Sequence, residues 1–519
     1  MRLHDFMEYY ARETPENPCV EMGDVRYNYA SANTFCNRLA HACISANMAK
    51  GERLAWLSKN CIEEMLVFYG GSKVGVVPTP INYRLAPPEW AYIIDDSGAR
   101  VLVVEEEFCA GIDSVRAKLP NVERFICLDG QPAGWESFTD WLNGQPENNP
   151  SHAISESDDL YQMYTSGTTG LPKGAVLSQR AIAANTRMIT MELQMQVGDT
   201  RILCALPMYH AAAGISHKCT VSVGGSVVVH RDFNPVAVVD DLVRHRVTNC
   251  TLVPAMIQAC LVHVPDIAER KFPDLRSMGY GASPIAEETL RQAMAAFGCR
   301  FVQVFGMTET TACATLLSSG AHQRALEGEP HLLLSCGRAA PGTRIKIVDE
   351  AGEEVPLGEV GEIAVNGPQL MTSYWHLPEA TAKTLRDGWL YTGDAARMDE
   401  EGFVYIQDRI KDMIVTGGEN VYPKEVENAL FDHPAIADAA VIGVPDEKYG
   451  EAILAFVVIR EAADLSLEDM ISFCRERLAG YKVPRQMQII DEIPRNPSGK
   501  VLKKDLREPY WEGVERRVG

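Results

Sequence analysis

Residues 161–175 read YQMYTSGTTGLPKGA, and the order of residue types in this stretch carries the first chemical signal in the chain. An apolar lead typical of a strand runs into the hydroxyl- and glycine-rich segment TSGTTG, which Lys173 follows. Glycines let successive backbone N–H groups point into one concavity, while hydroxyls and a lysine add donors and positive charge, so the loop suits a polyphosphate. A plain flexible turn is the alternative interpretation. The loop is not a Walker A motif, because Pro172 precedes the lysine and Gly174 follows it, which disfavours an ordinary ATPase or kinase.

On both sides of this loop, short runs rich in Val and Ile alternate with longer helical stretches. VLVVEEE (101–107), SVVVH (226–230) and LAFVVI (454–459) are typical of strands, whereas EETLRQAMAAFG (287–298) is typical of a helix. This alternation predicts the α/β class. A chain of 519 residues is expected to form two to four folding units.

The charge balance is acidic, with 49 Lys and Arg against 70 Asp and Glu and a net charge of −21. Such a field repels nucleic acid and anionic lipid at long range, so we expect no nucleic-acid partner. One window, residues 475–507, is the exception, because it holds nine basic and four acidic residues. Its ordinary interpretation is an exposed surface with scattered charge.

The cysteines and the termini indicate where the protein works. The 14 cysteines are scattered without a C-x-x-C pair, so we expect reduced thiols and no zinc site. The first residues do not resemble a signal peptide, and no apolar run approaches the length that would span a bilayer. We therefore expect a cytoplasmic protein without a transmembrane segment. Peripheral membrane contact stays open, as does the choice between monomer and homodimer.

The 161–175 segment closely resembles the phosphate loop of the adenylate-forming superfamily, which includes acyl-CoA synthetases, aryl-CoA ligases, peptide-synthetase adenylation domains and beetle luciferases. The other motifs of this superfamily follow in order along nearly the whole chain. They are PMYHAAAG (207–214), GYGASP (279–284), VFGMTETT (304–311), GWLYTGD (388–394), DRIKDMIVTGGENVYPKEVE (408–427) and PRNPSGKVLKKDL (494–506). The chain is identified as a member on these motifs.

The resemblance implies a particular division of the chain. Residues 1–407 would form a large body of several subdomains that holds the ATP and acyl sites, and residues 408–519 a small, mobile α+β domain. Asp408 matches the hinge residue about which the small domain rotates. The small domain would carry Lys500, which matches the superfamily's catalytic lysine, although a lone surface lysine is its alternative interpretation.

The nucleotide site is implied residue by residue. Phe305 would stack on adenine, Asp394 would accept hydrogen bonds from the ribose, and Glu309 with Thr165 would hold Mg²⁺ on the triphosphate. These residue types suit those tasks, although a core aromatic, a helix-starting acid and a turn aspartate are the ordinary alternatives. The implied ATP- or AMP-binding residues are Thr165, Ser166, Gly167, Thr168, Thr169, Gly170, Lys173, Gly281, Ala282, Ser283, Phe305, Gly306, Met307, Thr308, Glu309, Asp394, Arg409 and Lys411.

The reaction that the resemblance implies has two halves. A carboxylate attacks the α-phosphate of ATP to give acyl-AMP and pyrophosphate, with Lys500 and Mg²⁺ offsetting the added charge. The thiol of coenzyme A then attacks the acyl carbonyl and expels AMP. Gly417, Gly418 and Glu419 match the loop beside the pantetheine tunnel.

The acyl pocket is implied by the second motif. His210 matches a gating histidine of CoA ligases, although a packed histidine is the alternative. No Asp follows it to pair with a substrate ammonium, which disfavours an amino-acid-activating domain. Acetate-specific members carry a Trp where this chain has Gly306, so a larger acyl group is expected. The implied pocket residues are Tyr209, His210, Ala211, Gly214, Gly281 and Gly306.

The substrate that fits the pattern best is a medium- to long-chain fatty acid. An aryl or cinnamate-type acid or a steroid-derived acid stays open, and so does a luciferase-like oxygenase. A non-catalytic nucleotide-binding relative is the alternative from a different class. No G-x-S-x-G motif is present to support a serine hydrolase.

Overall fold

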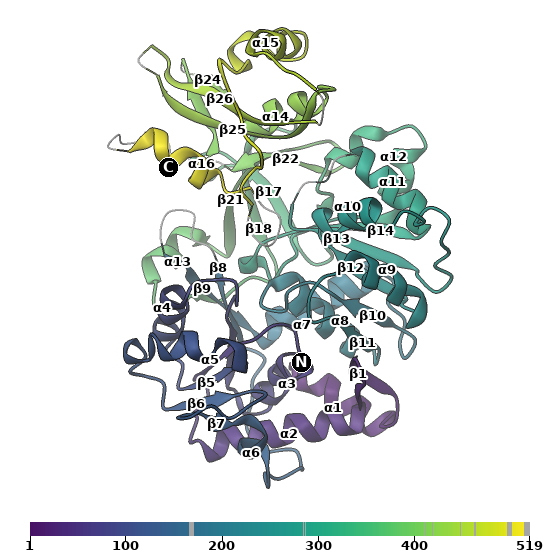
Figure 1. The fold of residues 1–519 in the computed structure, drawn as a ribbon, viewed down its shortest axis with the longest axis vertical. Helices are drawn as coiled ribbons and strands as arrows, with labels where there is room; N and C mark the ends of the chain where they lie inside the picture. Colours follow the sequence, from purple (N-terminus) through teal and green to yellow (C-terminus); the bar gives the residue numbers. More distant parts are fainter. Residues whose placement is uncertain are drawn as a thin grey trace. The chain divides into compact units, whose positions relative to one another are not determined.

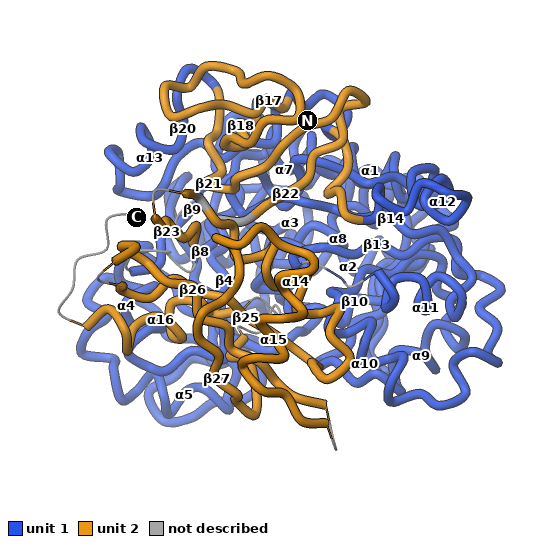
Figure 2. Tube along the Cα trace, turned by 90° about the horizontal axis from the view of Figure 1, so that it is seen from above, with its two compact units in different colours: residues 1–333, 339–344, 366–388 blue, residues 334–338, 345–365, 389–519 orange. Residues whose placement is uncertain are grey.

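The computed structural model describes residues 1–165, 171–283, 285, 287–409, 412–417, 419–446, 448–460, 463–495 and 501–512, with 408, 409 and 420 described by their backbone alone. Helices and strands alternate along the chain, which confirms the predicted α/β class (Figure 1). Contacts divide the chain into two compact units, coloured separately in Figure 2. Unit 1 comprises residues 1–333, 339–344 and 366–388, and unit 2 comprises residues 334–338, 345–365 and 389–519.

The largest sheet of unit 1 contains, in this spatial order, β15-β14-β13-β12-β10-β11-β1-β2, and the two-residue strand β16 (Arg338–Ala339) follows β15. Its inner strands are parallel, and antiparallel partners close the two ends. The inner strands are short. They are buried because helices cover a parallel sheet on both faces. The strands are β1 (Pro18–Met22), β2 (Val25–Asn28), β10 (Arg201–Cys204), β11 (Ser226–Val229), β12 (Asn249–Leu252), β13 (Ser277–Gly281), β14 (Arg300–Phe305) and β15 (Thr315–Leu317).

The helices of this part start where polar side chains can cap them. Ser178, Asn234 and Ser318 each accept a hydrogen bond from a backbone N–H in the first turn of α7, α9 and α12. Helix α8 packs against β10, β11 and β12 and also against α1 and α7, so it is buried on opposite sides. The helices are α1 (Leu3–Glu13), α2 (Tyr29–Ser45), α3 (Ile62–Val74), α7 (Gln179–Glu192), α8 (Ala211–Ser222), α9 (Pro235–Arg244), α10 (Pro254–His263), α11 (Glu287–Phe297) and α12 (Ser319–Leu326).

A second parallel sheet of unit 1 has the order β4-β3-β5-β6-β7. Its apolar side chains form one core cluster with those of the neighbouring helices. The elements are β3 (Arg53–Leu57), β4 (Val77–Pro80), α4 (Pro87–Ser97), β5 (Val101–Val104), α5 (Glu106–Asp113), β6 (Arg124–Cys127), β7 (Glu136–Ser137) and α6 (Phe138–Leu142).

A small third sheet of unit 1 joins segments that lie far apart in the sequence. Strands β8 (Asp159–Thr165) and β9 (Lys173–Ser178) form an antiparallel hairpin, and β19 (Ser373–Tyr374) adds to the outer side of β9. The short helix η2 (Thr308–Thr310) packs against β9. This sheet therefore brings two of the sequence motifs, the 161–175 segment and VFGMTETT, together with β19, which belongs to none of them.

Unit 2 has α+β architecture. One sheet contains β17-β18-β21, with β22 paired to β21, and the other has the order β24-β23-β26-β25, with β27 paired to β26. The contacts place residues 389–407 in the same unit as the C-terminal residues. The domain boundary that the sequence leads us to expect at Asp408 stays a prediction. The elements are β17 (Arg344–Val348), β18 (Gly361–Asn366), β21 (Trp389–Met398), β22 (Val404–Arg409), β23 (Ile414–Thr416), β24 (Glu419–Val421), α14 (Pro423–Phe431), β25 (Ile436–Asp446), β26 (Gly450–Ile459), α15 (Leu467–Arg475), β27 (Gln486–Ile489) and α16 (Lys503–Trp511).

Two general expectations can be compared with the fold. All 14 cysteines are free thiols, and only Cys299 is not fully buried. Within the described part of the chain, no helix combines the length and the apolar character that crossing a membrane requires.

Candidate functional site

The predicted phosphate loop lies at the end of the β8–β9 hairpin. Thr165 and Lys173 are directly opposite each other in the strand pairing, and the Thr165 hydroxyl donates to the Lys173 carbonyl at 3.4 Å. The loop residues Ser166, Gly167, Thr168, Thr169 and Gly170 lie outside the described residues. The hairpin therefore places both flanking candidates, a hydroxyl and an ammonium, at the base of one loop.

A tyrosine that the sequence did not single out links this loop to the predicted magnesium ligand. The Tyr374 hydroxyl donates to Glu309 Oε1 at 2.6 Å, and Lys173 Nζ lies 5.2 Å from the Tyr374 ring centroid. Glu309 is buried, with 5% exposure, and its backbone carbonyl accepts from the Met371 N–H at 2.8 Å. Nothing in the sequence near Tyr374 could have predicted this contact, because Tyr374 and Glu309 lie 65 residues apart in the chain. Tyr374 pairs with Ala175 of β9, and η2, which carries Glu309, packs against the same strand.

The segments predicted to flank adenine have unusual backbone conformations. Ala282 has φ 68°, and Thr311 and Ala312 have φ 52° and 70°. Left-handed conformations are rare outside glycine, and they cluster where a fold positions a functional segment. Ala282 is exposed and Ser283 is half-buried, directly after the last strand residue, Gly281.

Strand β14 carries the predicted adenine-stacking residue at its end. Phe305 is half-buried and pairs with Thr315 of β15, while Met307 donates its backbone N–H to the Thr310 hydroxyl at 3.0 Å. Thr308 then begins η2, so that Glu309 follows within a few residues of the aromatic ring. Local chain geometry thus keeps the VFGMTE motif together.

Two glycines of the predicted acyl pocket have their open sides occupied by protein. A Cβ atom on Gly214 would lie 2.8 Å from the Tyr161 hydroxyl oxygen, and one on Gly306 would lie 2.5 Å from the Ala312 carbonyl carbon. Close packing against the protein therefore explains why both positions are glycine. The size of the acyl group does not follow from the absence of a side chain at these positions. Their place in the acyl pocket stays a prediction.

The predicted gate residue, His210, is the N-cap of α8. Burial and the nearby Arg84 guanidinium lower the pKa of His210 to about 4, so the imidazole is neutral at pH 7. Its ring centroid lies 4.4 Å from that of Tyr209, and its Nε2 atom has no hydrogen-bond partner among the described residues. Ala211, the first helical residue, is half-buried.

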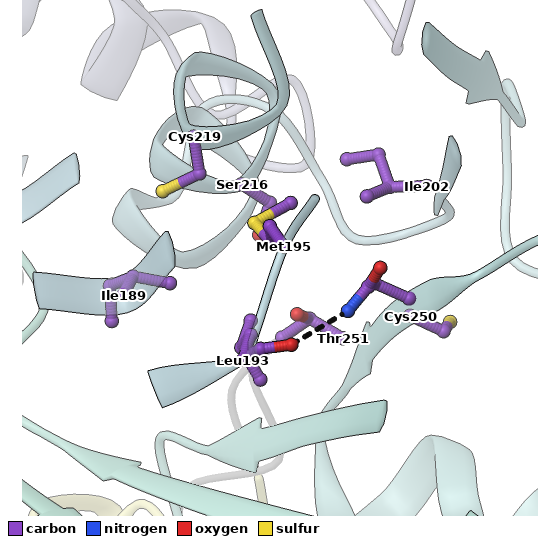
Figure 3. Close-up of a pocket in the computed structure, with 9 residues that line it drawn as sticks. Ile189, Leu193, Met195, Ile202, Ser216, Cys219, Cys250 and Thr251 are labelled. Atoms are coloured by element: carbon purple, nitrogen blue, oxygen red, sulfur yellow. Dashed lines mark hydrogen bonds between the residues drawn. The ribbon is translucent and has the colours of Figure 1, made fainter. Parts of the chain in front are cut away.

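A cavity lies among α7, α8, β10 and β12 (Figure 3). Two of its polar side chains bond to the protein, since Asn249 Nδ2 donates to the Leu193 carbonyl at 3.0 Å and the Ser216 hydroxyl donates to the Ala212 carbonyl at 2.7 Å. No Asp, Glu, Lys, Arg or His belongs to its lining. The lining residues are Ile189, Leu193, Met195, Ile202, Ser216, Cys219, Asn249, Cys250 and Thr251.

In unit 2, strand β21 holds the predicted ribose ligand. Asp394 is buried, with 5% exposure, and its backbone N–H donates to the Thr392 hydroxyl at 3.1 Å. Gly393 has φ 72° and donates its N–H to Glu362 Oε1 at 2.7 Å, where the pairing of β21 with β18 is irregular, so the TGD motif lies within a strand and not in a turn.

The predicted hinge and thiol-site residues are only partly described. Asp408 is in β22, and its backbone pairs with that of Ala395 in β21. The predicted residues that lie outside the described part are Lys411, Gly418, Lys500 and the side chain of Arg409. Gly417 has φ 62° and donates its N–H to the Tyr449 carbonyl at 2.8 Å. Glu419 follows at the exposed start of β24.

The basic window in unit 2 is largely neutralised by acids from outside it. Four of its cations form ion pairs with acidic side chains that the sequence window does not contain. The pairs are Lys482–Glu425 (2.7 Å), Arg495–Asp438 (2.8 Å), Lys503–Glu427 (2.9 Å) and Arg507–Asp412 (2.5 Å). The local positive charge that was counted along the sequence is therefore smaller in the folded unit.

Comparison with known proteins gives the same assignment across the chain. The family model described as AMP-binding enzyme matches residues 7–375, and the model of its C-terminal domain matches residues 425–500. The fatty acid–[acyl-carrier-protein] ligase ScoC of Streptomyces coeruleorubidus is 38% identical over 515 residues, which is 98% of this chain and 96% of that protein. The indoleacetate–CoA ligase of Aromatoleum aromaticum is 34% identical and covers 98% of both chains.

A solved structure extends the likeness to the fold. The Mycobacterium tuberculosis fatty acyl CoA synthetase superposes with a TM-score of 0.80 at 34% identity, covering 99% of each chain. Enzymes of this family use ATP to form acyl adenylates, and coenzyme A is a co-substrate of the CoA ligases among them. The chain therefore belongs to the AMP-binding enzyme family, and it is an AMP-forming acid–thiol ligase of the acyl- and aryl-CoA synthetase group.

Proposed function

We propose that this ligase activates a medium- to long-chain fatty acid through acyl-AMP and transfers the acyl group to coenzyme A. The observation that carries the choice of acid is the likeness to two enzymes named for fatty acids, ScoC and the Mycobacterium tuberculosis fatty acyl CoA synthetase. The cavity of Figure 3 is lined mainly by apolar side chains, but its volume is about 10 Å³, so an alkyl tail would enter it only after those side chains move. A substrate with a second carboxylate would bring a charge to a wall without a cation, and burying an unpaired charge is costly. Met195 has a flexible side chain that could move to admit an alkyl tail.

The cavity lies next to elements that carry predicted acyl-site residues. Helix α8 begins at His210, and Ser216 and Cys219, which line the cavity, follow on the same helix. Gly279 and Gly281 lie on one face of β13, and a Cβ on Gly279 would touch the cavity residues Thr251 and Leu193 at 3.0 and 3.6 Å. The two elements with predicted acyl-site residues thus also border the cavity.

We assign the first half-reaction to residues of both units. Lys173 with the 166–170 loop would bind the triphosphate, Phe305 would stack on adenine, Asp394 would bind the ribose, and Lys500 would stabilise charge at the α-phosphate. A buried carboxylate at Glu309 and a hydroxyl at Thr165 are the hard oxygen donors that Mg²⁺ prefers, so these residues fit the ion. Bound there, Mg²⁺ would offset negative charge on the phosphates.

We assign the second half-reaction to unit 2. The segment Gly417, Gly418 and Glu419 would border the pantetheine path, because a tight passage requires residues without bulky side chains. Rotation about Asp408 would exchange Lys500 for this turn, and Arg409 and Lys411 would contact the nucleotide. The free thiols support a cytoplasmic location, where cysteines stay reduced.

Two narrower alternatives have an observation in their favour. The ScoC likeness favours an acyl-carrier protein as the thiol acceptor, since that relative is named for it. The likeness to the indoleacetate–CoA ligase favours an aryl acid. A steroid-derived acid stays a third option for the substrate.

The test is thioester formation with purified full-length protein, ATP and Mg²⁺. Saturated acids of graded length, indoleacetate, a cinnamate and a steroid-derived acid are each offered with coenzyme A or with a phosphopantetheinylated carrier protein. The proposal expects the highest kcat/KM for a medium or long fatty acid with coenzyme A. Preference for an aryl or steroid-derived acid would contradict the substrate assignment, and preference for the carrier protein would contradict the acceptor assignment.

A further inference from the structure

A lysine sits in the interior of unit 1, on the helix that carries the predicted gate residue. Lys218 of α8 has 0% exposure and forms no ion pair within the described part of the chain. Its Nζ donates to the Gly214 carbonyl at 2.6 Å and lies 3.3 Å from His217 Nε2. The same atom lies 3.6 Å from the ring centroid of Phe68 and 4.8 Å from that of Tyr161.

This placement works against stability. Removal of an amine from water into apolar surroundings is costly, and burial lowers the pKa of Lys218 well below its ordinary value. An apolar side chain of similar length would fill the same space without that cost. Residues that break such a rule are expected chiefly where function requires them.

The contacts of Lys218 lead to the predicted acyl site. The Gly214 N–H donates to the His210 carbonyl at 2.9 Å, so two successive hydrogen bonds connect Lys218 Nζ with the gate residue. Phe68 belongs to α3 and Tyr161 to β8, the strand that ends at the phosphate loop. Tyr161 also packs on the open side of Gly214.

We propose that Lys218 is a positioning residue, which holds the first turn of α8 against α3 and β8 and thereby sets where His210 meets the acyl substrate. The inference rests on the proposed function, because it takes His210 as part of the acyl site. It adds that the position of this turn depends on one buried amine. Lys218 itself does not touch the substrate.

The test replaces the amine by a thioether of similar size, Lys218→Met. We expect the midpoint of thermal unfolding to stay the same or rise, because a buried polar group is removed. In acid-dependent ATP–pyrophosphate exchange, we expect kcat/KM for the acid to fall about 10- to 100-fold, since small displacements near a reacting centre cost that much. The KM for ATP should change less than about twofold.

Lys73 supplies a matched control in the same unit. It is also buried, with 2% exposure, but its ammonium pairs with Glu8 at 2.5 Å and donates to Asn149 Oδ1 at 3.1 Å, and among the described residues neither partner is a predicted site residue. We expect Lys73→Met to lower the unfolding midpoint without raising the KM for the acid selectively. Phe68→Leu is a second test in case Lys218→Met folds poorly. It removes the ring next to Lys218 Nζ but keeps the amine, so it should cause part of the same loss in kcat/KM for the acid.

The outcomes separate this inference from the proposed function. Lys218→Met with unchanged acid kinetics, or with losses in acid and ATP kinetics that follow a lowered midpoint, would overturn the positioning role while the parent enzyme stays active. Failure of the parent protein with every acid offered would instead contradict the proposed function itself.

Discussion

Tyr374 shows how one hydroxyl orders the candidate nucleotide site. It donates to the buried Glu309 carboxylate at 2.6 Å, while its ring lies beside the Lys173 ammonium. A hydrogen bond to a charged group is stronger than one between neutral groups, and loss of the donor leaves the carboxylate less well oriented.

We therefore expect Tyr374→Phe to slow adenylation about 10-fold or more, in line with the energy of a hydrogen bond to an ionised group. The measurement is ATP–pyrophosphate exchange at several Mg²⁺ concentrations. Tyr405→Phe is the control, because Tyr405 donates to Asp399 at 3.1 Å in unit 2 and neither residue is a predicted site residue. Equal activities of the two variants would contradict the role of Tyr374.

At the scale of elements, α8 has two different buried sides. Ser216 and Cys219 face the cavity next to the sheet, whereas Gly214 and Lys218 face Phe68 and Tyr161. A helix buried on opposite sides can respond to changes on one side by shifting against the other, because protein interiors are close-packed.

A larger side chain on the cavity side should shorten the preferred acid. We expect Ser216→Phe to lower kcat/KM for long acids while short acids keep most of theirs, at a stability cost of about 1–3 kcal/mol for overpacking. Val243→Phe, at a position on α9 that is 44% exposed, should leave the chain-length profile unchanged. Equal losses of kcat/KM for short and long acids would show that the acyl tail does not occupy the cavity.

The other side of α8 predicts a pH dependence of stability. The folded pKa of Lys218 is lowered by burial, whereas the unfolded lysine stays protonated up to about its ordinary value of 10.5. Unfolding then takes up a proton, so the free energy of unfolding should rise with pH between the lowered pKa and 10.5, by about 1.4 kcal/mol per pH unit at most.

Lys218→Met should remove this contribution. The excess stability of the variant should be largest near neutral pH and shrink as pH rises toward 10, as measured by urea unfolding at a series of pH values. The groups that act on Lys218 are His217, Glu64, Cys204 and Cys219, so the series is repeated in a Glu64→Gln background. A constant difference across pH would mean that the amine is charged in the folded protein.

At the scale of the whole molecule, the cysteines are part of the core. Burial raises the pKa of most of these thiols, for example that of Cys36 to about 12, and a thiol reacts through its thiolate. A thiol reagent at pH 8 should thus modify the native protein slowly, at Cys299 first, whereas all 14 should react after unfolding. Rapid modification of several native thiols would contradict the buried arrangement.

The sequence alone determined the family, the α/β class and the residues of each contiguous motif. Chemistry held within a short stretch of chain is readable without a fold, as in the Thr165–Lys173 hairpin, the TGD segment that ends at Asp394 and η2 around Glu309. Spacing along the chain fixes such groups relative to one another, because only a few backbone dihedrals separate them.

The tertiary structure decided which distant groups meet. Tyr374 contacts Glu309, and Tyr161 packs against Gly214, only because the fold brings them together. The fold also buries Lys218 and pairs cations of the basic window with acids from elsewhere in unit 2. Sequence patterns report the periodicity of local structure, but strand pairing and close packing set contacts across hundreds of residues. For that reason the motifs predicted the chemistry, while the burial of Lys218 in α8 and the packing of Tyr161 against Gly214 came only from the folded chain.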